Sequence, residues 1–217
     1  MPGVKKTYRA FFIGDACLCW PLGAAIGRET SLRVLCAYRR LKADKNLRAL
    51  GVHDLVPSYT ALAVHAHPLC DWRAVRRAVD ACFASLPAAE AQLSARTARH
   101  ILPVVYRGED LPRVAALTGL TAEEVIRRHA SARYMVAMIG FRPHFPYLLG
   151  LDPALIAPRL DAPRLKVPAG AVAIGGAQTG VYPEDSPGGW NILGMTDPEL
   201  LKAIKPGDTV IFQRTHG

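Results

Sequence analysis

The sequence predicts an α+β domain followed by a mainly-β barrel, and three observations support this order. Apolar residues in the first 86 positions alternate between strand-like and helix-like spacing. From Gly140 onward no long helical pattern appears, and 11 of the 18 glycines and 10 of the 17 prolines lie there. The stretch between the regions, Leu86 to Arg99, is Ala-rich and polar like a linker. We therefore expect domains at residues 1–92 and 93–217.

The predicted N-terminal domain has the element order of a ferredoxin-like α+β fold. Residues 8–20 form two short strands joined by a turn, and a helix from Glu29 to Lys42 follows. Two strands, Val52 to Val56 and Ser58 to Ala66, precede a second helix with Asp71 as its N-cap. We expect one more strand after this helix, so that both helices cover one face of an antiparallel sheet.

The predicted C-terminal domain starts with one strand and two helices. Ile101 to Tyr106 is a β run, Leu111 to Thr118 is a short helix, and Thr121 to Glu124 is a capping box for the next helix. The remaining expected strands are Tyr134–Phe141, Ala169–Gly175, Val181–Tyr182, Trp190–Leu193 and Thr209–Phe212. Short strands between Gly- and Pro-rich turns are typical of a β-barrel with long loops.

The net charge of +9 does not by itself indicate nucleic-acid binding. The Arg and Lys residues between Arg28 and Arg48, and between Arg73 and Arg77, stand at helical spacing among apolar residues, as on a solvated helix face. We therefore predict no nucleic-acid partner. A basic rim that attracts a carboxylate or phosphate substrate, or an acidic partner, fits this distribution better.

Several further classes are disfavoured by the sequence. No apolar run approaches the roughly 20 residues that span a bilayer, and no secretory signal follows Met1, so we expect a cytoplasmic protein without a membrane segment. Five cysteines, all in the first half and without a CxxC pair, predict reduced thiols. His65 and His67 lack a third ligand, so we predict no metal site.

The usual catalytic signatures are absent: there is no Walker A loop, no GxGxxG, no GxSxG and no HExxH. Val167 to Trp190 is rich in glycine and proline, which is typical either of a rigid site wall or of turns in a barrel. Its Gly175-Gly176-x-x-x-Gly180 segment lacks the Lys-Ser/Thr of a phosphate loop.

A few polar residues are candidates for chemistry. His129 stands on the apolar side of a helix, where a structural histidine is the better interpretation. His144 lies among prolines and aromatics in a loop, where an imidazole could titrate near neutral pH. Arg159 and Arg164 each follow a proline, and fixed arginines suit carboxylate or phosphate binding. The alternative for both is an ion pair with Asp152 or Asp161.

Several ordered motifs match one family over essentially the whole chain. They are Asp54-Leu55-Val56-Pro57-Ser58-Tyr59, Ile101 to Tyr106 with Gly108-Glu109-Asp110-Leu111, Gly119-Leu120-Thr121-x-Glu123-Glu124-Val125-Ile126-x-x-His129, Ile139-Gly140-Phe141-x-Pro143-x-Phe145-Pro146-Tyr147-Leu148, Pro158-Arg159, Pro163-Arg164, Val167-Pro168-Ala169-Gly170, Gly175-Gly176-x-Gln178-Thr179-Gly180-x-Tyr182-Pro183 and Ser186-Pro187-Gly188-Gly189-Trp190. Together they resemble the PxpB family of bacterial 5-oxoprolinase components, also called the KipI or allophanate hydrolase subunit 1 family.

The resemblance implies a ferredoxin-like domain followed by a cyclophilin-like barrel. It implies a PxpC/KipA-type partner subunit and, for full activity, a PxpA-type subunit. With them, the family opens the lactam of 5-oxo-L-proline to L-glutamate, driven by ATP hydrolysis. The chain would be inactive alone, with the ATP site shared with or located on a partner.

Related domains in urea amidolyase also handle a small amide, so the resemblance implies a pocket that polarises an amide. Gln178 and the backbone amides near Gly188-Gly189 are natural hydrogen-bond donors for this purpose. The expected catalytic residues are Gln178, His144 and Tyr182. The expected substrate-binding residues are Phe141, Tyr147, Arg159, Arg164, Thr179, Ser186, Gly188, Gly189 and Trp190.

Two departures from the family pattern stand out. His144 occupies a position where the family usually has glycine, which adds an imidazole beside the predicted pocket and disfavours a backbone with positive φ. The segment from Thr196 to Pro206 is shorter than is common in the family. The change to His144 affects the expected identity of the substrate. The shorter segment affects the expected edge of the site or the surface that meets a partner.

Two alternative functions follow from the same resemblance. The KipI name implies an inhibitor of a sporulation histidine kinase, with the barrel as a docking surface. The urea amidolyase relationship implies an allophanate or urea carboxyltransferase-type subunit that works with biotin. The chain contains no Ala-Met-Lys-Met motif, so a biotinylated chain would have to be separate.

Overall fold

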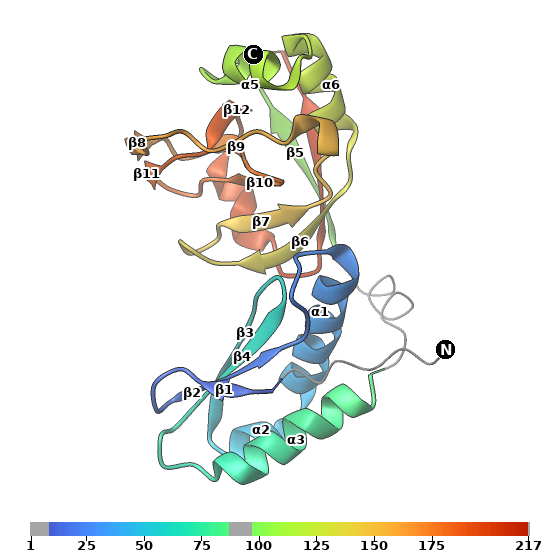
Figure 1. Cartoon of the computed structure of the whole chain (residues 1–217), viewed down its shortest axis with the longest axis vertical. Helices are drawn as coiled ribbons and strands as arrows, with labels where there is room; N and C mark the ends of the chain where they lie inside the picture. The colour runs from blue at the N-terminus through green and yellow to red at the C-terminus, as the bar shows by residue number, and fades with distance from the viewer. Residues whose placement is uncertain (1–8, 87–96, 217) are drawn as a thin grey trace. The chain divides into compact units, whose positions relative to one another are not determined.

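The computed structural model describes residues 9–86 and 97–216, which belong to two compact units (Figure 1). The predicted boundary between residues 92 and 93 lies outside the described residues, as does the strand expected after the second helix. No described helix combines the length and the apolar character that crossing a membrane requires.

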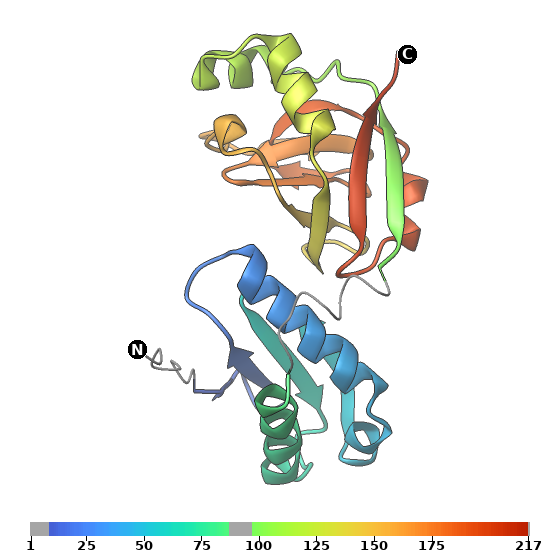
Figure 2. The same cartoon turned by 90° about the vertical axis from the view of Figure 1, so that its right-hand side faces the viewer.

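The N-terminal unit is a four-stranded antiparallel sheet with helices on one face (Figures 1 and 2). Its elements are β1 (Phe11–Phe12), β2 (Cys17–Pro21), α1 (Arg28–Ala43), α2 (Lys45–Ala49), β3 (Val52–Pro57), β4 (Ala61–Ala66) and α3 (Trp72–Ala84). The strand order is β1-β2-β4-β3. Apolar residues of α1 and α3 pack on the inward residues of β2 and β4, such as Leu18 and Leu62, and form the core.

Most of this unit agrees with the α+β prediction. The Asp71 carboxylate accepts hydrogen bonds from the amides of Arg73 and Ala74, so it caps α3 as expected. The predicted start of β4 at Ser58 was too early, because Ser58 closes a turn by donating its amide to the Ala61 carbonyl. The five-residue helix α2 was not predicted, since so short a helix has no periodicity to detect.

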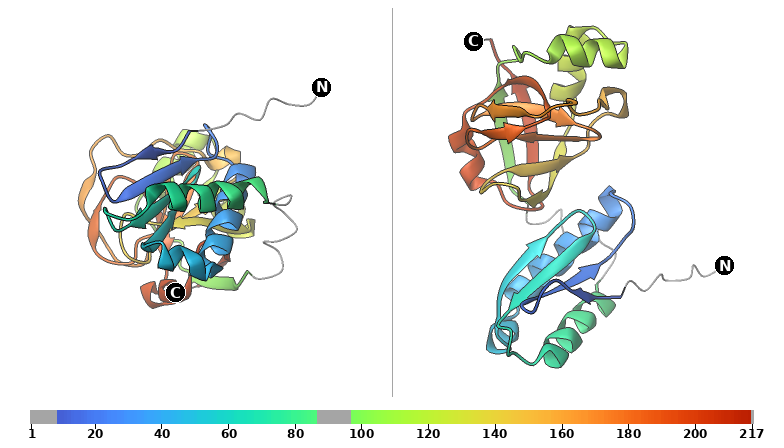
Figure 3. Two further views of the ribbon diagram at one scale, coloured as in Figure 1. Left: turned by 90° about the horizontal axis from the view of Figure 1, so that it is seen from below. Right: turned by 60° about the vertical axis from the view of Figure 1, so that its left-hand side comes forward.

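The C-terminal unit is a nearly closed seven-stranded barrel (Figure 3). Its elements are β5 (Arg99–Val104), α5 (Leu111–Thr118), α6 (Ala122–Ser131), β6 (Tyr134–Ile139), β7 (Pro146–Leu149), η2 (Pro153–Leu155), β8 (Arg164–Val167), β9 (Ala171–Gly175), β10 (Gln178–Val181), β11 (Ser186–Gly188), β12 (Asn191–Met195), η3 (Pro198–Ala203) and β13 (Thr209–Arg214). The strand order is β12-β9-β10-β7-β6-β13-β5. Val105 and Met195 exchange two backbone hydrogen bonds and so join the two ends of the sheet.

Two apolar clusters lie on opposite faces of this barrel wall. The interior core takes residues from all seven strands and from α5 and α6. A second cluster forms on the outer face of β9 and β10. On β9, Ala171 and Ala173 of this cluster alternate with the interior residues Val172 and Ile174, and after β10 the cluster residue Tyr182 follows the interior residue Val181. Strands β8 and β11 pair only with each other and make a ribbon beside this outer cluster (Figure 1).

The fold class predicted from the sequence is confirmed. Helix α5 has the predicted bounds, and the Thr121 hydroxyl accepts from the Glu124 amide at the start of α6. The prediction missed β7, β8 and β11, which have three or four residues each. No described helix after Gly140 is longer than the six-residue 3-10 segment η3, in line with the expected β-rich second half.

Candidate functional site

Five aromatic side chains gather on the outer face of the barrel wall and form what we call the aromatic cluster: Phe141, Phe145, Tyr147, Tyr182 and Trp190. Phe145 is its centre, with ring centroids 4.9 Å from Tyr147, 5.1 Å from Tyr182 and 5.7 Å from Trp190. Phe145 is fully buried, while Tyr147 is half-buried and Phe141 is 59% exposed. The cluster therefore has a packed base and an accessible edge.

Gly175 and Gly188 lack a Cβ because the aromatic cluster lies directly on their backbone. A Cβ at Gly175 would stand 2.6 Å from the Trp190 ring, and one at Gly188 would stand 2.3 Å from the Tyr182 hydroxyl oxygen. Both distances are far below contact. These two glycines thus belong to a wall that carries large aromatic side chains.

The two candidate arginines have different roles. Arg164 forms ion pairs with Glu109 at 2.9 Å and with the buried Asp110 at 2.7 Å, and Asp110 also accepts from the Ile192 amide. Arg159 lies over the Trp190 ring, 5.6 Å from its centroid, and forms no ion pair with any described carboxylate. The expected alternative, a pair with Asp152 or Asp161, is formed by neither arginine within the described residues. Arg164 therefore fastens β8 to the start of α5, and Arg159 is a cation open to a ligand.

Strand alternation separates the candidates on β10. Gln178, Gly180 and Tyr182 follow the outer face, next to the aromatic cluster. Thr179 points into the barrel, where it is fully buried and donates to the Ala173 carbonyl. Gln178 therefore lies on the same face as the cluster, whereas Thr179 lies on the opposite one.

Thr179 belongs to a buried polar network around His129. The Thr179 proton goes to the Ala173 carbonyl, so its oxygen accepts from His129 Nε2, 2.9 Å away. Nδ1 of His129 then accepts from the Tyr106 hydroxyl at 2.8 Å. Burial lowers the pKa of His129 to about 3, so the imidazole is neutral at pH 7. The structural interpretation of His129 agrees with this geometry.

His144 occupies the loop between β6 and β7 with a φ of 66°, and Phe141 has a φ of 68°. Histidine at position 144 therefore does not exclude a positive φ, because the backbone adopts the left-handed conformation at both positions. The loop is held by hydrogen bonds from Arg142 to Gly140 and from Phe145 to Arg142, and by an Arg142–Glu184 ion pair. His144 itself is exposed at the rim.

Tyr182 is buried with its hydroxyl beside Gly188, and burial raises its pKa above the usual value. The backbone amide of Trp190 hydrogen-bonds to this hydroxyl and opposes the rise in pKa. Burial also raises the pKa of Tyr147, against the nearby charge of Arg159. Both phenols are therefore protonated near neutral pH and can donate hydrogen bonds.

Two further candidates lie around the β8–β11 ribbon. Ser186 is 3% exposed, and its hydroxyl has no hydrogen-bond partner among the described residues. The Gly189 carbonyl accepts from the Leu160 amide at 2.8 Å, which ties the ribbon to the loop that carries Arg159.

Sequence reasoning missed Phe145 and Asp110 as residues that build the site. Phe145 stands inside one of the family motifs, and its position between Pro143 and Tyr147 was the available signal. The Asp110–Arg164 pair spans 54 positions and therefore leaves no local signal in the sequence.

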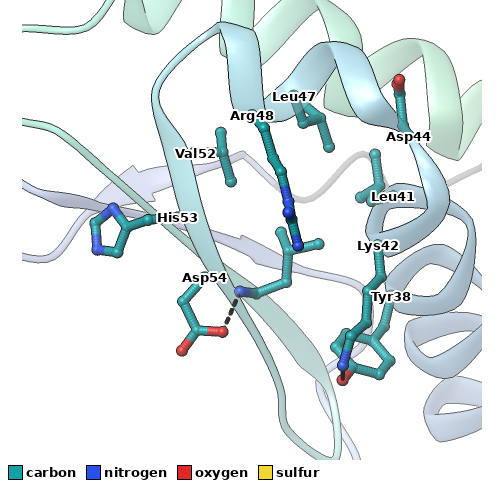
Figure 4. A pocket seen from close by; sticks show the side chains of 10 residues that line it. Tyr38, Leu41, Lys42, Asp44, Leu47, Arg48, Val52, His53 and Asp54 are labelled. Atoms are coloured by element: carbon teal, nitrogen blue, oxygen red, sulfur yellow. Dashed lines mark hydrogen bonds between the residues drawn. The ribbon is translucent and has the colours of Figure 1, made fainter.

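A separate pocket lies wholly in the N-terminal unit and contains none of the predicted site residues (Figure 4). It is lined by Leu41, Leu47 and Val52 of the core, by Arg48 and by Lys42, whose ammonium group donates to Tyr38. Asp54, also at this pocket, accepts from the Leu55 amide.

The described residues offer few groups that could hold a metal ion or a phosphate. Residues 9–86 and 97–216 contain no set of three or more His, Cys, Asp or Glu side chains that could hold a metal ion. Gly175 ends β9 and pairs with Gln178, so Gly176 and Ala177 form the hairpin turn, and the Gly176 amide donates to the Ala157 carbonyl, 2.8 Å away. That amide is thus engaged within the barrel, and the segment does not fit a triphosphate.

Comparison with known proteins shows the family to which this fold belongs. Residues 8–207 match the family model "Carboxyltransferase domain, subdomain C and D". The chain therefore belongs to the carboxyltransferase C and D subdomain family. This confirms the resemblance drawn from the motifs.

Relatives within this family carry a more particular name, that of the 5-oxoprolinase B subunit. The chain is 48% identical over 138 residues to the protein of this name from Haemophilus influenzae, a match that covers 57% of the chain and 63% of that protein. It is 36% identical over 182 residues to the protein of the same name from Bacillus subtilis, with 76% of each covered.

Solved structures extend the comparison. The crystal structure of TTHA0988 superimposes with a TM-score of 0.76 at 37% identity, over 93% of this chain but only 40% of that one. The Kluyveromyces lactis urea amidolyase matches with a TM-score of 0.74 at 15% identity, over 95% of this chain and 15% of that one, which shows a shared fold alone. In both, this fold is one part of a longer polypeptide.

Proposed function

We propose that this chain is the B subunit of an ATP-dependent 5-oxoprolinase, which converts 5-oxo-L-proline, ATP and water to L-glutamate, ADP and phosphate. The names of the curated relatives support this activity. The observation that carries it is Arg159 on the face of Trp190, without a described carboxylate partner and beside an accessible aromatic edge. A small cyclic amide with one carboxylate has the matching chemistry.

In this proposal the outer wall binds and orients the substrate. Arg159 holds the carboxylate, while Tyr147 and Trp190 pack on the ring. The Gln178 side-chain amide donates to the lactam oxygen, where negative charge develops as the carbonyl is attacked. Tyr182 stays protonated and serves as a donor, and His144 exchanges protons with solvent at the rim.

We assign ATP binding to a partner subunit. The resemblance implies ATP use, yet the described residues provide one arginine without a carboxylate partner at the site and no phosphate-binding loop. A PxpC/KipA-type subunit would then complete the site, and a PxpA-type subunit would complete the enzyme. The greater length of the TTHA0988 chain, of which this fold is 40%, supports a second protein part beside the barrel.

The test is reconstitution with the PxpC/KipA-type and PxpA-type subunits from the same genome, with 5-oxoproline-dependent ADP release as the readout. We expect turnover with the full set and none when any one component is omitted. No turnover with the full set, together with slowed autophosphorylation of a sensor histidine kinase by this chain alone, would favour the kinase-inhibitor alternative. Carboxyl transfer from a biotinylated protein to urea would favour the carboxyltransferase alternative.

A further inference from the structure

The segment that carries Arg159 runs along the outer wall and contacts three successive wall residues. The amide of the residue after Arg159 donates to the Gly189 carbonyl at 2.8 Å. The Arg159 guanidinium lies over the ring of the next wall residue, Trp190. The third wall residue, Asn191, donates from its side-chain Nδ2 to the Pro158 carbonyl at 2.9 Å. A hydrogen bond therefore fixes the backbone on each side of Arg159.

Asn191 is fully buried, and its side-chain amide forms three hydrogen bonds. Besides the bond to Pro158, Nδ2 donates to the Ile174 carbonyl at 3.2 Å, and Oδ1 accepts from Arg113 Nη1 at 2.8 Å. A guanidinium can only donate and a backbone carbonyl can only accept, so these neighbours permit one orientation of the amide. Nδ2 therefore faces the Pro158 carbonyl, and an apolar or acidic side chain could not make this bond.

Arg113 on α5 holds the oxygen of this amide in place. The helix packs beside β12, which begins at Asn191, and the Arg113 side chain is half-buried there. Within residues 9–86 and 97–216 Arg113 forms no ion pair, whereas Arg164 pairs with two carboxylates. Hydrogen bonds thus connect α5 to the backbone at the base of the Arg159 side chain.

A role in holding the barrel together explains only one of the three bonds. Asn191 lies opposite Ile174 in the β12–β9 ladder, so the bond to the Ile174 carbonyl belongs to strand pairing. The bonds to Pro158 and Arg113 reach residues 33 and 78 positions away, outside that ladder. Their effect is to fix the segment that carries the cation.

We propose that Asn191 is a positioning residue for Arg159 and that Arg113 sets the orientation of Asn191. The inference rests on the proposed function, in which Arg159 binds the substrate carboxylate. An arginine side chain has many rotamers, and a fixed backbone at its base reduces the entropy that it loses on binding a ligand. Asn191 and Arg113 act through the Pro158 carbonyl, so they affect the affinity for the carboxylate rather than the chemical step.

The experiment measures KM and kcat for 5-oxoproline by ADP release in the complex reconstituted with the full-length chain. Asn191→Leu keeps the approximate volume and removes the bond to Pro158, so we expect the KM to rise about fivefold with kcat within about twofold of the wild type. The decisive comparison adds Arg159→Ala. Without a guanidinium to position, Asn191→Leu should raise the KM by less than about twofold further.

Arg113 provides a second test if Asn191→Leu does not fold. Arg113→Leu leaves Asn191 in place but removes the donor to its oxygen, and we expect the KM to rise about threefold. Arg113→Lys keeps a donor and should recover most of this loss. Arg127→Leu, which removes the same charge from an exposed pair with Glu124 on α6, is the matched control and should change the KM less than about twofold.

The outcomes separate this inference from the proposed function. Wild-type turnover, with a KM that neither Asn191→Leu nor Arg113→Leu changes, overturns the inference and leaves the proposed function intact, even if the melting temperature falls. A rise in KM that is equally large in the Arg159→Ala background also overturns it, since Asn191 would then act independently of Arg159. No turnover by the complete wild-type set overturns the proposed function and the inference with it.

Discussion

The interior core of the barrel and the aromatic cluster on its outer wall are built from the same strands, but the polar groups in the two places differ in whether they have protein partners. Inside, His129, Tyr106 and Thr179 satisfy one another, and each hydrogen bond ends on a protein atom. Outside, Arg159 lies on Trp190 without a carboxylate partner among the described residues. The polar groups of the interior are thus satisfied within the protein, whereas the outer wall keeps a cation that the proposed function assigns to a ligand.

The largest expected effect comes from removing the cation that binds the buried Asp110. Arg164→Ala leaves that carboxylate with the Ile192 amide but without its guanidinium partner, so we expect a loss of about 3 kcal/mol in unfolding free energy. Urea denaturation measures it. Arg142→Ala, which breaks the half-exposed pair with Glu184, is the control and should cost less than about 0.5 kcal/mol. Equal losses would contradict the structural role of Arg164.

The pH dependence of stability tests the interior network. His129 has a folded-state pKa of about 3, below the ordinary 6.5, so its contribution is present above pH 6.5 and is lost as the pH falls toward 3. Between about pH 6.5 and pH 5 we expect a loss of about 2 kcal/mol from this group. His129→Phe should flatten that slope in denaturation curves measured at several pH values. An unchanged slope would show that other groups cause the acid sensitivity.

Two substitutions that compensate each other test the contact between the β8–β11 ribbon and the outer wall of the barrel. Gly188→Ala places a Cβ against the Tyr182 hydroxyl, and we expect a destabilisation of about 1–2 kcal/mol. Tyr182→Phe removes that oxygen, so the double variant should recover part of the loss. Strict additivity of the two changes in thermal denaturation would mean that the clash lies elsewhere.

The smallest expected effect is at the rim. His144→Gly relieves a left-handed residue with a φ of 66°, although glycine also gains freedom in the unfolded chain, so we expect a stabilisation of at most about 1 kcal/mol. Differential scanning calorimetry measures the change. In the reconstituted enzyme the same variant should shift the pH profile of turnover if His144 exchanges protons there. An identical profile would limit His144 to a backbone role.

Much of this architecture could be predicted from local signals. Caps at Asp71 and Thr121 set the helix starts, and apolar alternation located most long strands. The β8–β11 ribbon could not be predicted, because its pairing of Ser186 with Val167 joins segments of three and four residues. Strand alternation already separates Thr179 from Gln178, but only the fold shows which of the two faces is the interior.

The candidate site was predictable as a set of motifs but not as an arrangement. Phe141, Tyr147, Tyr182 and Trp190 come together because Phe145 packs between them, and the motif that contains Phe145 does not show this central position. The different roles of Arg159 and Arg164 depend on which carboxylates the fold brings near. That information is non-local, since Asp110 lies 54 positions from Arg164.

The most direct test of the outer wall as the substrate-binding face is the KM for 5-oxoproline of the reconstituted complex carrying Arg159→Ala. We expect the KM to rise about tenfold or more, because the carboxylate loses its cation, while the melting temperature stays near that of the wild type. An unchanged KM with normal turnover would contradict the account and move the substrate away from the aromatic cluster.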